Sequence, residues 1–191
     1  MEEQYKPYHH YKGDELTPSE KVERRVVELL LNSKVPDNKR DSSVVFELKH
    51  SSECIQIARM LAQKRRLDIS LAESIAALHD IYVIVHGIYK DHAKLGAPIA
   101  EKIVRDMGGF SSKEAKIISD AVAHHSEKDV YTNKPYIELI KDVDVFACSL
   151  YKNAEEEYRL SKSASLFKEY SNRVKKVRKE FNLNPNPVWR K

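Results

Sequence analysis

The segment LHDIYVIVHGIYKDH, from Leu78 to His92, places an imidazole and a carboxylate side by side in an otherwise apolar run. Helical periodicity puts His79 on the same face as Leu71 and Leu78, so its ring is expected to point into the core. Asp80 follows about 100° further around the helix and can approach the same point. An unpaired buried carboxylate is costly, and such a group normally ionises only beside a partner or a metal ion. The segment therefore predicts a buried polar site that other parts of the chain complete.

Other helical patterns also carry inward-facing imidazoles. His50 falls on the apolar stripe of a helix expected over residues 44–65. His125 falls on the corresponding stripe of a helix expected over residues 112–126, and His124 follows the neighbouring apolar positions. For any one of these residues alone, an ordinary core histidine or a helix-end salt bridge is the favoured interpretation. The set as a whole is better explained by a divalent metal ion, because imidazole and carboxylate suit Zn, Fe, Mn, Ni or Co.

Two aspartates lie in the helix that is expected to run from Pro135 to about residue 153. Asp144 shares a face with Ile140 and is predicted to be the buried one. Asp142 shares a face with Glu138 and is predicted to lie on the wetter side. Asp144 is therefore the aspartate that we expect at the polar site.

The chain of 191 residues is long enough for one domain with a sizeable core. It is 41% hydrophobic and 32% charged, with only 5 glycines, as is typical of a helical globular protein. The net charge is +4, but cations and anions are interspersed, which argues against a dedicated nucleic-acid face. No apolar run approaches the roughly 20 residues of a membrane span, and the polar N-terminus is not a signal peptide. Because the two cysteines form no CxxC pair, a reduced, cytoplasmic environment without membrane association is expected.

The patterns predict one all-α domain, a single compact helical bundle. Residues 1–17 are expected to form a flexible arm, residues 18–183 the helical domain, and residues 184–191 an extended tail. Capping signals set several boundaries: Thr17 before the first helix, and Ser-x-x-Glu boxes that start at Ser70 and Ser111. The remaining expected helices cover residues 22–31, 70–85, 97–107 (with Pro98 in its first turn and Gly108 at its end), and a charged C-terminal helix that ends near Phe181.

His50, the His79–Asp80 pair and Asp144, each on a separate helix, resemble the ligand motif of the HD superfamily of metal-dependent phosphohydrolases. The resemblance covers residues 44–150, and the segments ELKHSSECIQIARMLA, LAESIAALHDI, DHAKLGAPIAEKIV and KDVDVFA agree with it. It implies a bundle of the HD-domain type that hydrolyses a phosphate ester of a nucleotide or related small molecule. The nucleophile would be a metal-bound water, with Asp80 as the catalytic ligand.

The resemblance also implies the metal ligands, since the full set is similar to that of HD proteins that hold two ions. The implied ligands are His50, His79, Asp80, Asp144, His92, His124 and His125. Asp80 would bridge the two ions, and one of the adjacent pair His124–His125 is left open as a phosphate contact. We expect one ion of Mn, Fe, Ni, Co or Zn, with a second ion left open. Lys94 and Lys90 are candidates for phosphate binding, although a solvated lysine is the favoured interpretation for each.

Three departures from family patterns leave the exact substrate open. No glycine soon follows Asp80, the Glu-Asp pair of guanosine-tetraphosphate hydrolases is missing, and no Gly-Tyr-Pro motif follows His125. The expected partner is a small phosphate ester, a nucleotide by preference; nucleic acid is not expected, and a homodimer is left open. Two alternatives remain: an HD-fold di-iron oxygenase and a non-catalytic HD module that binds a ligand.

A few other polar residues receive less specific interpretations. His86 either lines the pocket or makes an ordinary hydrogen bond in the core or at a helix end, whereas His9 and His10 are expected to be solvated. The basic run RVKKVRKEF, residues 173–181, has spaced apolar residues that favour an amphipathic helix packed on the domain over a nucleic-acid contact. The two cysteines each follow a proposed ligand by four residues and are interpreted as small packing residues.

Overall fold

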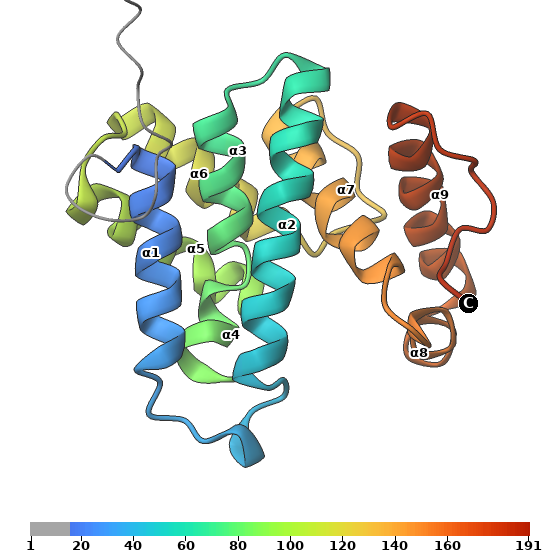
Figure 1. The fold of residues 1–191 in the computed structure, drawn as a ribbon, viewed down its shortest axis with the longest axis horizontal. Helices are drawn as coiled ribbons and strands as arrows, with labels where there is room; N and C mark the ends of the chain where they lie inside the picture. Colours follow the sequence, from blue (N-terminus) through green and yellow to red (C-terminus); the bar gives the residue numbers. More distant parts are fainter. Residues whose placement is uncertain (1–15) are drawn as a thin grey trace, which may run out of the picture.

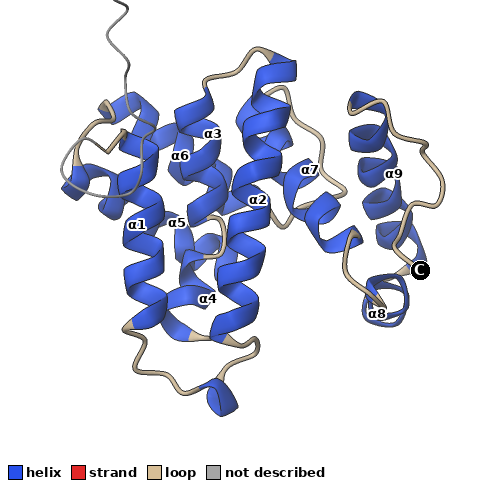
Figure 2. Cartoon of the chain, in the orientation of Figure 1, coloured by secondary structure: helices blue, strands red, loops and turns tan. Residues whose placement is uncertain are grey.

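The computed structural model describes residues 16–191, and this part of the chain consists of helices and loops without a strand (Figures 1 and 2). The all-α prediction is therefore confirmed. Most of the expected N-terminal arm lies outside the described residues, as do His9 and His10. The helices are α1 (Pro18–Leu31), α2 (Val44–Arg65), α3 (Ile69–Leu78), α4 (Ile81–His86), α5 (His92–Met107), α6 (Ser112–His124), α7 (Pro135–Ser149), α8 (Ala154–Ser161) and α9 (Ala164–Glu180), with a short 3-10 turn at Asp37–Lys39.

Helix α3 lies at the centre of the bundle, where it packs against α1, α2, α6 and α7 (Figure 1). Residues 71–78 are all buried. By length and composition, the stretch Ile69–His86 could cross a membrane, which corrects the expectation that no apolar run approaches a membrane span. In this fold 72% of that stretch is buried inside the protein. Its apolar character is accounted for by its central position in the core.

The helix that was expected to continue to about residue 85 is divided in the structure. Helix α3 ends at Leu78 and α4 begins at Ile81, with Asp80 between them at φ −101° and ψ 23°. In a continuous helix, adjacent side chains diverge by about 100°. The break therefore allows the neighbouring side chains of His79 and Asp80 to point toward one centre.

The start of α3 also differs from the prediction. Asp68, not Ser70, caps the helix, and its Oδ1 accepts a hydrogen bond from a backbone N–H at 2.8 Å. Glu73 does not complete a box with Ser70, because its carboxylate accepts from the Ser19 hydroxyl of α1 at 2.8 Å. A long-range contact has thus taken the side chain that the local pattern assigned to capping.

Other boundaries agree in part. The boxes Thr17–Glu20 and Ser111–Glu114 are both formed, which confirms these two starts. Helix α5 begins at His92, earlier than expected, so that Pro98 lies inside the helix and not in its first turn. Helix α7 ends at Ser149, short of the expected 153.

The single helix expected at the C-terminus is two helices, α8 and α9, with Ser163 capping the second. Val174 and Val177 of α9 are fully buried, and this helix packs against α7. The prediction of an amphipathic helix packed on the domain is confirmed. After α9, Trp189 is 4% exposed and stacks on Phe167 with ring centroids 5.5 Å apart, which holds the tail against α9.

Candidate metal centre

Six side chains from five parts of the fold converge between α2, α3, α5, α6 and α7. Three close contacts define one side of the cluster. His50 Nε2 lies 3.2 Å from His79 Nε2 and 3.3 Å from Asp144 Oδ1, and His79 Nε2 lies 3.2 Å from Asp80 Oδ2. These groups come from α2, the α3–α4 break and α7, as the sequence predicts for separate helices.

Two more imidazoles approach Asp80 from its other oxygen. His92, the first residue of α5, has its Nε2 3.2 Å from Asp80 Oδ1. His125, the residue directly after α6, has its Nε2 3.4 Å from the same oxygen and 3.0 Å from His92 Nε2. Each oxygen of Asp80 therefore faces a different pair of imidazoles, and the carboxylate lies between the two halves of the cluster.

Hydrogen bonds to the Nδ1 atoms indicate which ring nitrogens are open. His79, His92 and His125 place Nδ1 against the carbonyls of residues 76, 89 and 122, at 2.7, 2.6 and 2.8 Å. A carbonyl only accepts, so each Nδ1 must carry the proton and donate. When the rings are neutral, their Nε2 lone pairs point at one another and at Asp80. Lone pairs cannot hydrogen-bond to each other, so this arrangement needs positive charge among the rings, which either a bound metal ion or a proton on one of the Nε2 atoms supplies.

The fourth ring is fixed in a similar way by a tyrosine. Tyr151 donates its hydroxyl hydrogen to Glu53 Oε2 at 2.5 Å. Its oxygen can then accept from His50 Nδ1 at 3.2 Å, which leaves the Nε2 of His50 open toward the cluster. Partners of this type on the outer nitrogen are usual for metal-binding histidines.

The spacing of the donor atoms also fits a metal ion. With bonds of about 2.0–2.2 Å to nitrogen and oxygen, the ligands of one ion lie roughly 3.0–3.5 Å apart. The closest contacts between the clustered nitrogen and oxygen atoms are 3.0–3.4 Å. Each side of the cluster offers two imidazoles and at least one carboxylate oxygen, a donor set that suits divalent transition metals. The residues present therefore fit such an ion.

Charges within the cluster show how strongly it favours a cation. Burial raises the pKa of the Asp80 carboxyl, but His79 and the hydrogen bonds from three imidazoles outweigh it and hold this pKa well below its usual range. Burial lowers the pKa of His79, but the charge of Asp80 outweighs that effect and raises it to about 9. Burial lowers the pKa of His125 to about 4. The cluster thus holds the Asp80 carboxylate, which is stabilised by positive charge, beside the His125 ring, which resists protonation.

His124 does not join the cluster. Its side chain is 46% exposed, and its Nδ1 lies 2.9 Å from Glu127 Oε2. Helix α6 ends at this residue, and the following turn directs His125 inward instead. The ligand role suggested for His124 has no support in this geometry, because adjacent residues at a helix end point in different directions.

We expect His124→Ala to keep its bound metal and most of its activity, whereas His125→Ala loses any ion held by the half of the cluster around Asp80 Oδ1. Metal analysis of the two purified variants after dialysis distinguishes them. The reverse result would contradict the placement of both rings.

The two candidate phosphate lysines and His86 also lie apart from the close contacts of the cluster. Lys90 and Lys94 are exposed near the start of α5, where side chains can reach solvent. His86 is exposed at the end of α4 and packs on Tyr82, with ring centroids 4.5 Å apart. The helix-end position is therefore the one that His86 occupies.

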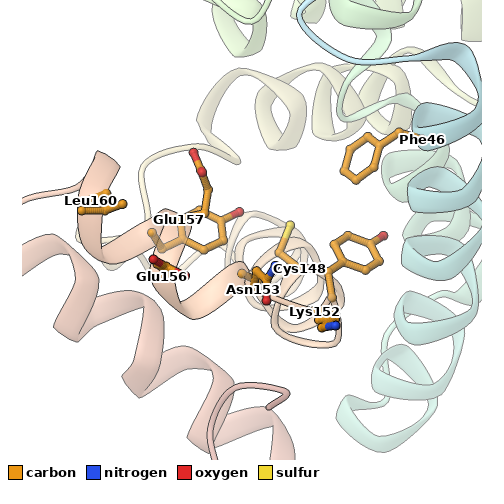
Figure 3. A pocket seen from close by; sticks show the side chains of 10 residues that line it. Phe46, Cys148, Lys152, Asn153, Glu156, Glu157 and Leu160 are labelled. Atoms are coloured by element: carbon orange, nitrogen blue, oxygen red, sulfur yellow. The ribbon is translucent and has the colours of Figure 1, made fainter.

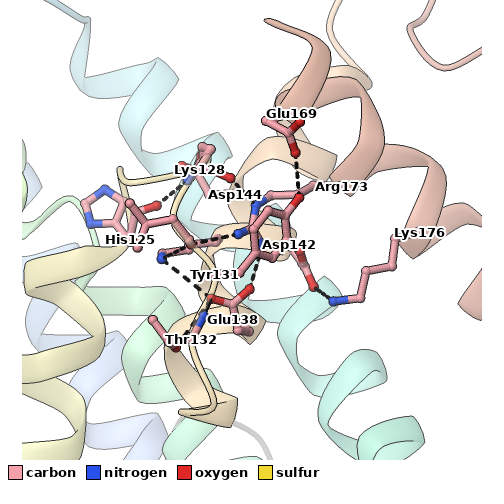
Figure 4. Close-up of polar contacts among 12 residues, drawn as sticks. His125, Lys128, Tyr131, Thr132, Glu138, Asp142, Asp144, Glu169, Arg173 and Lys176 are labelled. Carbon is pink, nitrogen blue, oxygen red and sulfur yellow. Dashed lines mark hydrogen bonds and ion pairs between the residues drawn. The ribbon is translucent and has the colours of Figure 1, made fainter. Parts of the chain in front are cut away.

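The prediction that Asp142 lies on the wetter side of α7 is wrong. Its side chain is 0% exposed, whereas that of Asp144 is 18% exposed. Asp142 is covered by α2 and α9, and it pairs with Arg65 at 2.7 Å and with Arg173 at 2.8 Å. Lys176 contacts it as well, at 2.8 Å (Figure 4). Burial raises the pKa of Asp142, but these cations outweigh that effect and lower it.

Lys128 is a residue of the site that the sequence analysis missed. It is 1% exposed, and its ammonium group lies 2.6 Å from Asp144 Oδ2 and 2.5 Å from the carbonyl of His125 (Figure 4). Its charge helps to lower the pKa of Asp144, although burial acts in the opposite direction. The signal available in the sequence was its spacing of three residues after His125, inside a loop that shows no periodicity.

Glu47 was missed as well. It lies one helical turn before His50, is 1% exposed, and accepts a hydrogen bond from the Tyr89 hydroxyl at 2.9 Å. Burial and the charge of Asp80 raise its pKa. Its i, i+3 spacing from His50 was a signal that could have found it.

The two cysteines lie beside the cluster. Cys54 Sγ is 3.6 Å from His50 Nε2, and Cys148 Sγ is 3.6 Å from Asp144 Oδ1. Both are buried, and burial raises the pKa of each thiol well above its usual range. The neutral thiols pack against the proposed ligands, consistent with the interpretation made from their spacing.

Comparisons with known proteins agree with the fold. The family model of the HD domain matches residues 48–169. A solved structure of a predicted HD superfamily hydrolase from an uncultured Thermotogales bacterium has a TM-score of 0.52 and 19% identity, covering 83% of this chain and 88% of that chain. At this identity, the structural match concerns the fold alone.

Curated relatives share part of the chain. Ribonuclease Y of Chloroflexus aurantiacus is 30% identical over 96 residues, which are 50% of this chain and 17% of the relative. Ribonuclease Y of Petrotoga mobilis is 30% identical over 103 residues, and that of Chlorobium phaeobacteroides 28% over 102 residues; each match covers 53% of this chain and 18% of the relative. The chain therefore spans less than a fifth of the length of these relatives.

Proposed function

Because this chain belongs to the HD domain family, we propose that it is a metal-dependent phosphohydrolase that cleaves a phosphate ester of a nucleotide or a related small molecule. Family membership supports metal-dependent phosphate-ester hydrolysis in general terms. The choice of a nucleotide ester and the assignment of individual ligands go beyond it and are our proposals.

One observation carries the proposal. Four imidazoles with their Nδ1 atoms already engaged direct open Nε2 atoms toward the Asp80 carboxylate. We assign His50, His79, Asp80 and Asp144 to a first ion, and Asp80, His92 and His125 to a second. His124 is left out of the ligand set because its ring pairs with Glu127.

The chemistry follows from these residues. These residues would hold a divalent cation, which would supply positive charge to a phosphoryl oxygen and would lower the pKa of a water molecule from about 15.7 toward 7. Asp80 offers one oxygen to each half of the cluster and is also placed to accept a proton from an attacking water. Lys128 holds the outer oxygen of Asp144, so that the inner oxygen stays turned toward His50. Tyr151 keeps the proton of His50 on Nδ1.

The test is a screen of metals against substrates on the purified protein, with its metal content measured first. We expect hydrolysis of nucleoside monophosphates or of a small phosphodiester that depends on Mn, Fe, Co, Ni or Zn and is abolished by a chelator. Metal binding without turnover of any phosphate ester would overturn the proposal in favour of a non-catalytic module. Iron with a mixed-valence EPR signal and substrate-dependent oxygen uptake would favour an oxygenase.

A second candidate is cleavage of phosphodiester bonds in RNA, favoured by the name of the curated relatives. The same chemistry at the metal centre would serve it. An end-labelled single-stranded RNA, included in the screen, separates the two candidate functions. Internal cuts in the RNA, with no release of phosphate from mononucleotides, would favour the nuclease.

The two aspartates of α7 provide a separate prediction. Asp144→Asn should lose bound metal, because it weakens the contact to His50 and removes the charge opposite Lys128. Asp142→Asn should keep its metal but unfold at a lower temperature, because three cations lose their buried partner. Metal analysis and thermal unfolding of both variants check this. Loss of metal from Asp142→Asn with normal stability would contradict it.

A further inference from the structure

Two glutamates flank His50 on α2, and each accepts a hydrogen bond from a tyrosine that contacts a different half of the cluster. Glu53, three residues after His50, accepts from the Tyr151 hydroxyl at 2.5 Å. Glu47, three residues before His50, accepts from the Tyr89 hydroxyl at 2.9 Å. At 100° per residue, the two glutamates lie about 60° to either side of His50 around the helix. Helix α2 therefore presents one carboxylate toward each half.

Tyr89 contacts His92 in two ways. Its backbone carbonyl accepts a hydrogen bond from His92 Nδ1 at 2.6 Å, and its ring meets the imidazole edge to face, with centroids 5.5 Å apart. His92 is the first residue of α5 and follows Asp91, whose backbone is left-handed at φ 55°. Because no turn of α5 precedes His92, the direction of its Nε2 depends on where Tyr89 lies.

The loop that carries Tyr89 is attached to the segment before α2. The backbone N–H of Tyr89 donates to Asp41 Oδ2 at 2.7 Å, and the N–H of Asp41 donates to the carbonyl of Gly87 at 2.8 Å. The Ser42 hydroxyl donates to the same oxygen of Glu47 that accepts from Tyr89. Glu47 thus joins α2 to the loop before it and to the loop before α5.

The two glutamate–tyrosine pairs differ in burial. Glu47 is 1% exposed, whereas the side chain of Glu53 is 33% exposed. Tyr151 lines an open pocket of about 590 Å³, and the same lining includes Phe46 and Cys148 (Figure 3). Water can replace a partner that Glu53 loses, but it has little access to Glu47. The loss of a partner is therefore expected to affect the cluster more strongly at the buried pair.

We propose that Glu47 and Tyr89 are a positioning pair for His92, and that this pair sets the affinity of the second ion. That ion is the one assigned to Asp80, His92 and His125, so the proposal deepens the proposed function and rests on it. Glu47 holds the hydroxyl of Tyr89, and the backbone of Tyr89 fixes the imidazole of His92. The Nε2 of this ring is thereby kept 3.2 Å from Asp80 Oδ1.

Calorimetric titration of the metal-free protein with Mn²⁺ tests the proposal. We expect two binding steps in the unaltered protein, and the step that His92→Ala weakens most belongs to the second ion. Tyr89→Phe, which removes only a hydroxyl group, should weaken this step about tenfold and leave the other step within about twofold, because lost partners of metal ligands typically reduce affinity 10–100-fold. Glu47→Ala should have the same effect. The double variant should be no weaker than either single variant, because both changes break one contact.

Glu47→Gln separates the hydrogen bond from the charge. Glutamine keeps an oxygen that can accept from Tyr89, so the second ion should bind with an affinity close to that in the unaltered protein. A loss as large as that in Glu47→Ala would overturn the positioning role. The matched control is Tyr131→Phe, because the Tyr131 hydroxyl donates to Glu169 of α9 at 2.8 Å. This control should leave both binding steps unchanged.

Thermal unfolding of each variant separates positioning from stability. A lower unfolding temperature in Tyr89→Phe with both binding steps unchanged would overturn the proposal. A single binding step in the unaltered protein, or equal weakening of both steps in Tyr89→Phe, would overturn it as well.

Hydrolysis measured on the same samples keeps the two proposals apart. A weakened second step in Tyr89→Phe, without hydrolysis of any phosphate ester by the unaltered protein, would overturn the proposed function and leave the role of the pair standing. Metal-dependent hydrolysis with the second step unchanged in Tyr89→Phe and Glu47→Ala would do the opposite.

Discussion

Asp80→Ala is expected to lose bound metal and phosphohydrolase activity together, while the helices remain folded. The carboxylate contacts His79 through one oxygen, and His92 and His125 through the other. Its removal leaves both halves of the cluster without their shared anion. The fall in kcat/KM should exceed the roughly 10²–10³-fold cost of removing a single electrostatic group from an active site. Metal analysis, a phosphatase assay and circular dichroism measure the three properties on one sample.

A matched control for this change is Asp106→Ala. Asp106 is a carboxylate in the last turn of α5, and its side chain is 62% exposed and paired with Lys102. We expect its metal content and activity to match those of the unaltered protein, because an exposed ion pair contributes little. Full activity in Asp80→Ala would contradict the proposed mechanism. Loss of helical structure in Asp80→Ala would be separated from loss of metal by repeating the analysis with Asp80→Asn, which keeps the shape of the side chain.

The second large effect is expected for Arg173→Ala. This variant should lower the free energy of unfolding by about 3–5 kcal/mol. This guanidinium of α9 is 0% exposed and lies 2.8 Å from Asp142 and 2.9 Å from Glu138 (Figure 4). It also donates to the carbonyls of Lys128, at 2.6 Å, and of Val130, at 3.2 Å. Alanine would leave the fully buried Asp142 with only Arg65 and Lys176 as cationic partners, and would remove a donor from Glu138 and from two carbonyls. Urea denaturation followed by circular dichroism measures the change.

Lys176→Ala is the matched control, because Lys176 also belongs to α9 and contacts the same carboxylate at 2.8 Å. Its side chain is 47% exposed, so solvent screens the pair and its replacement should cost no more than about 1 kcal/mol. Similar losses in the two variants would show that burial does not set the strength of these contacts.

The variant Arg173→Ala also tests a connection between α9 and the metal centre. Arg173 holds the carbonyl of Lys128, and the side chain of Lys128 in turn contacts Asp144 and the backbone of His125. Arg173→Ala should therefore weaken metal binding even at temperatures where the protein remains folded, and Arg173→Lys should restore part of it. Unchanged metal affinity in folded Arg173→Ala would limit the role of the network to stability.

Helical periodicity was sufficient to predict much of the site. His50, His79 and Asp144 were each placed on an apolar face by residues three or four positions away in the chain. The structure brings all three to one cluster, with separations of 3.2–3.3 Å between the atoms of neighbouring ligands. The pattern succeeds for these three residues because α2, α3 and α7 all contact one another, so that their apolar faces meet in the same interior.

Periodicity failed where the answer depended on a segment far away in sequence. Asp142 lies on the side of α7 that the pattern assigned to solvent, yet α9 covers that side and supplies Arg173 as a partner. Glu73 was assigned to a capping box but bonds to Ser19 of α1. Lys128 lies in a loop, where no period indicates direction. None of these contacts can be recognised from the sequence of a single helix.

The sequence by itself determined the all-α class, most of the helices and the polar residues that face inward, because these depend on the spacing of side chains along one helix. Only the tertiary structure decided which of His124 and His125 reaches the cluster, and that Asp142 is buried beside Arg173 instead of lying on the wetter side of α7. A helix pattern defines faces, but it does not say what will cover each face. That is decided when α9 packs on α7, and when α3 breaks at the His79–Asp80 pair so that both side chains meet the ligands of the other helices.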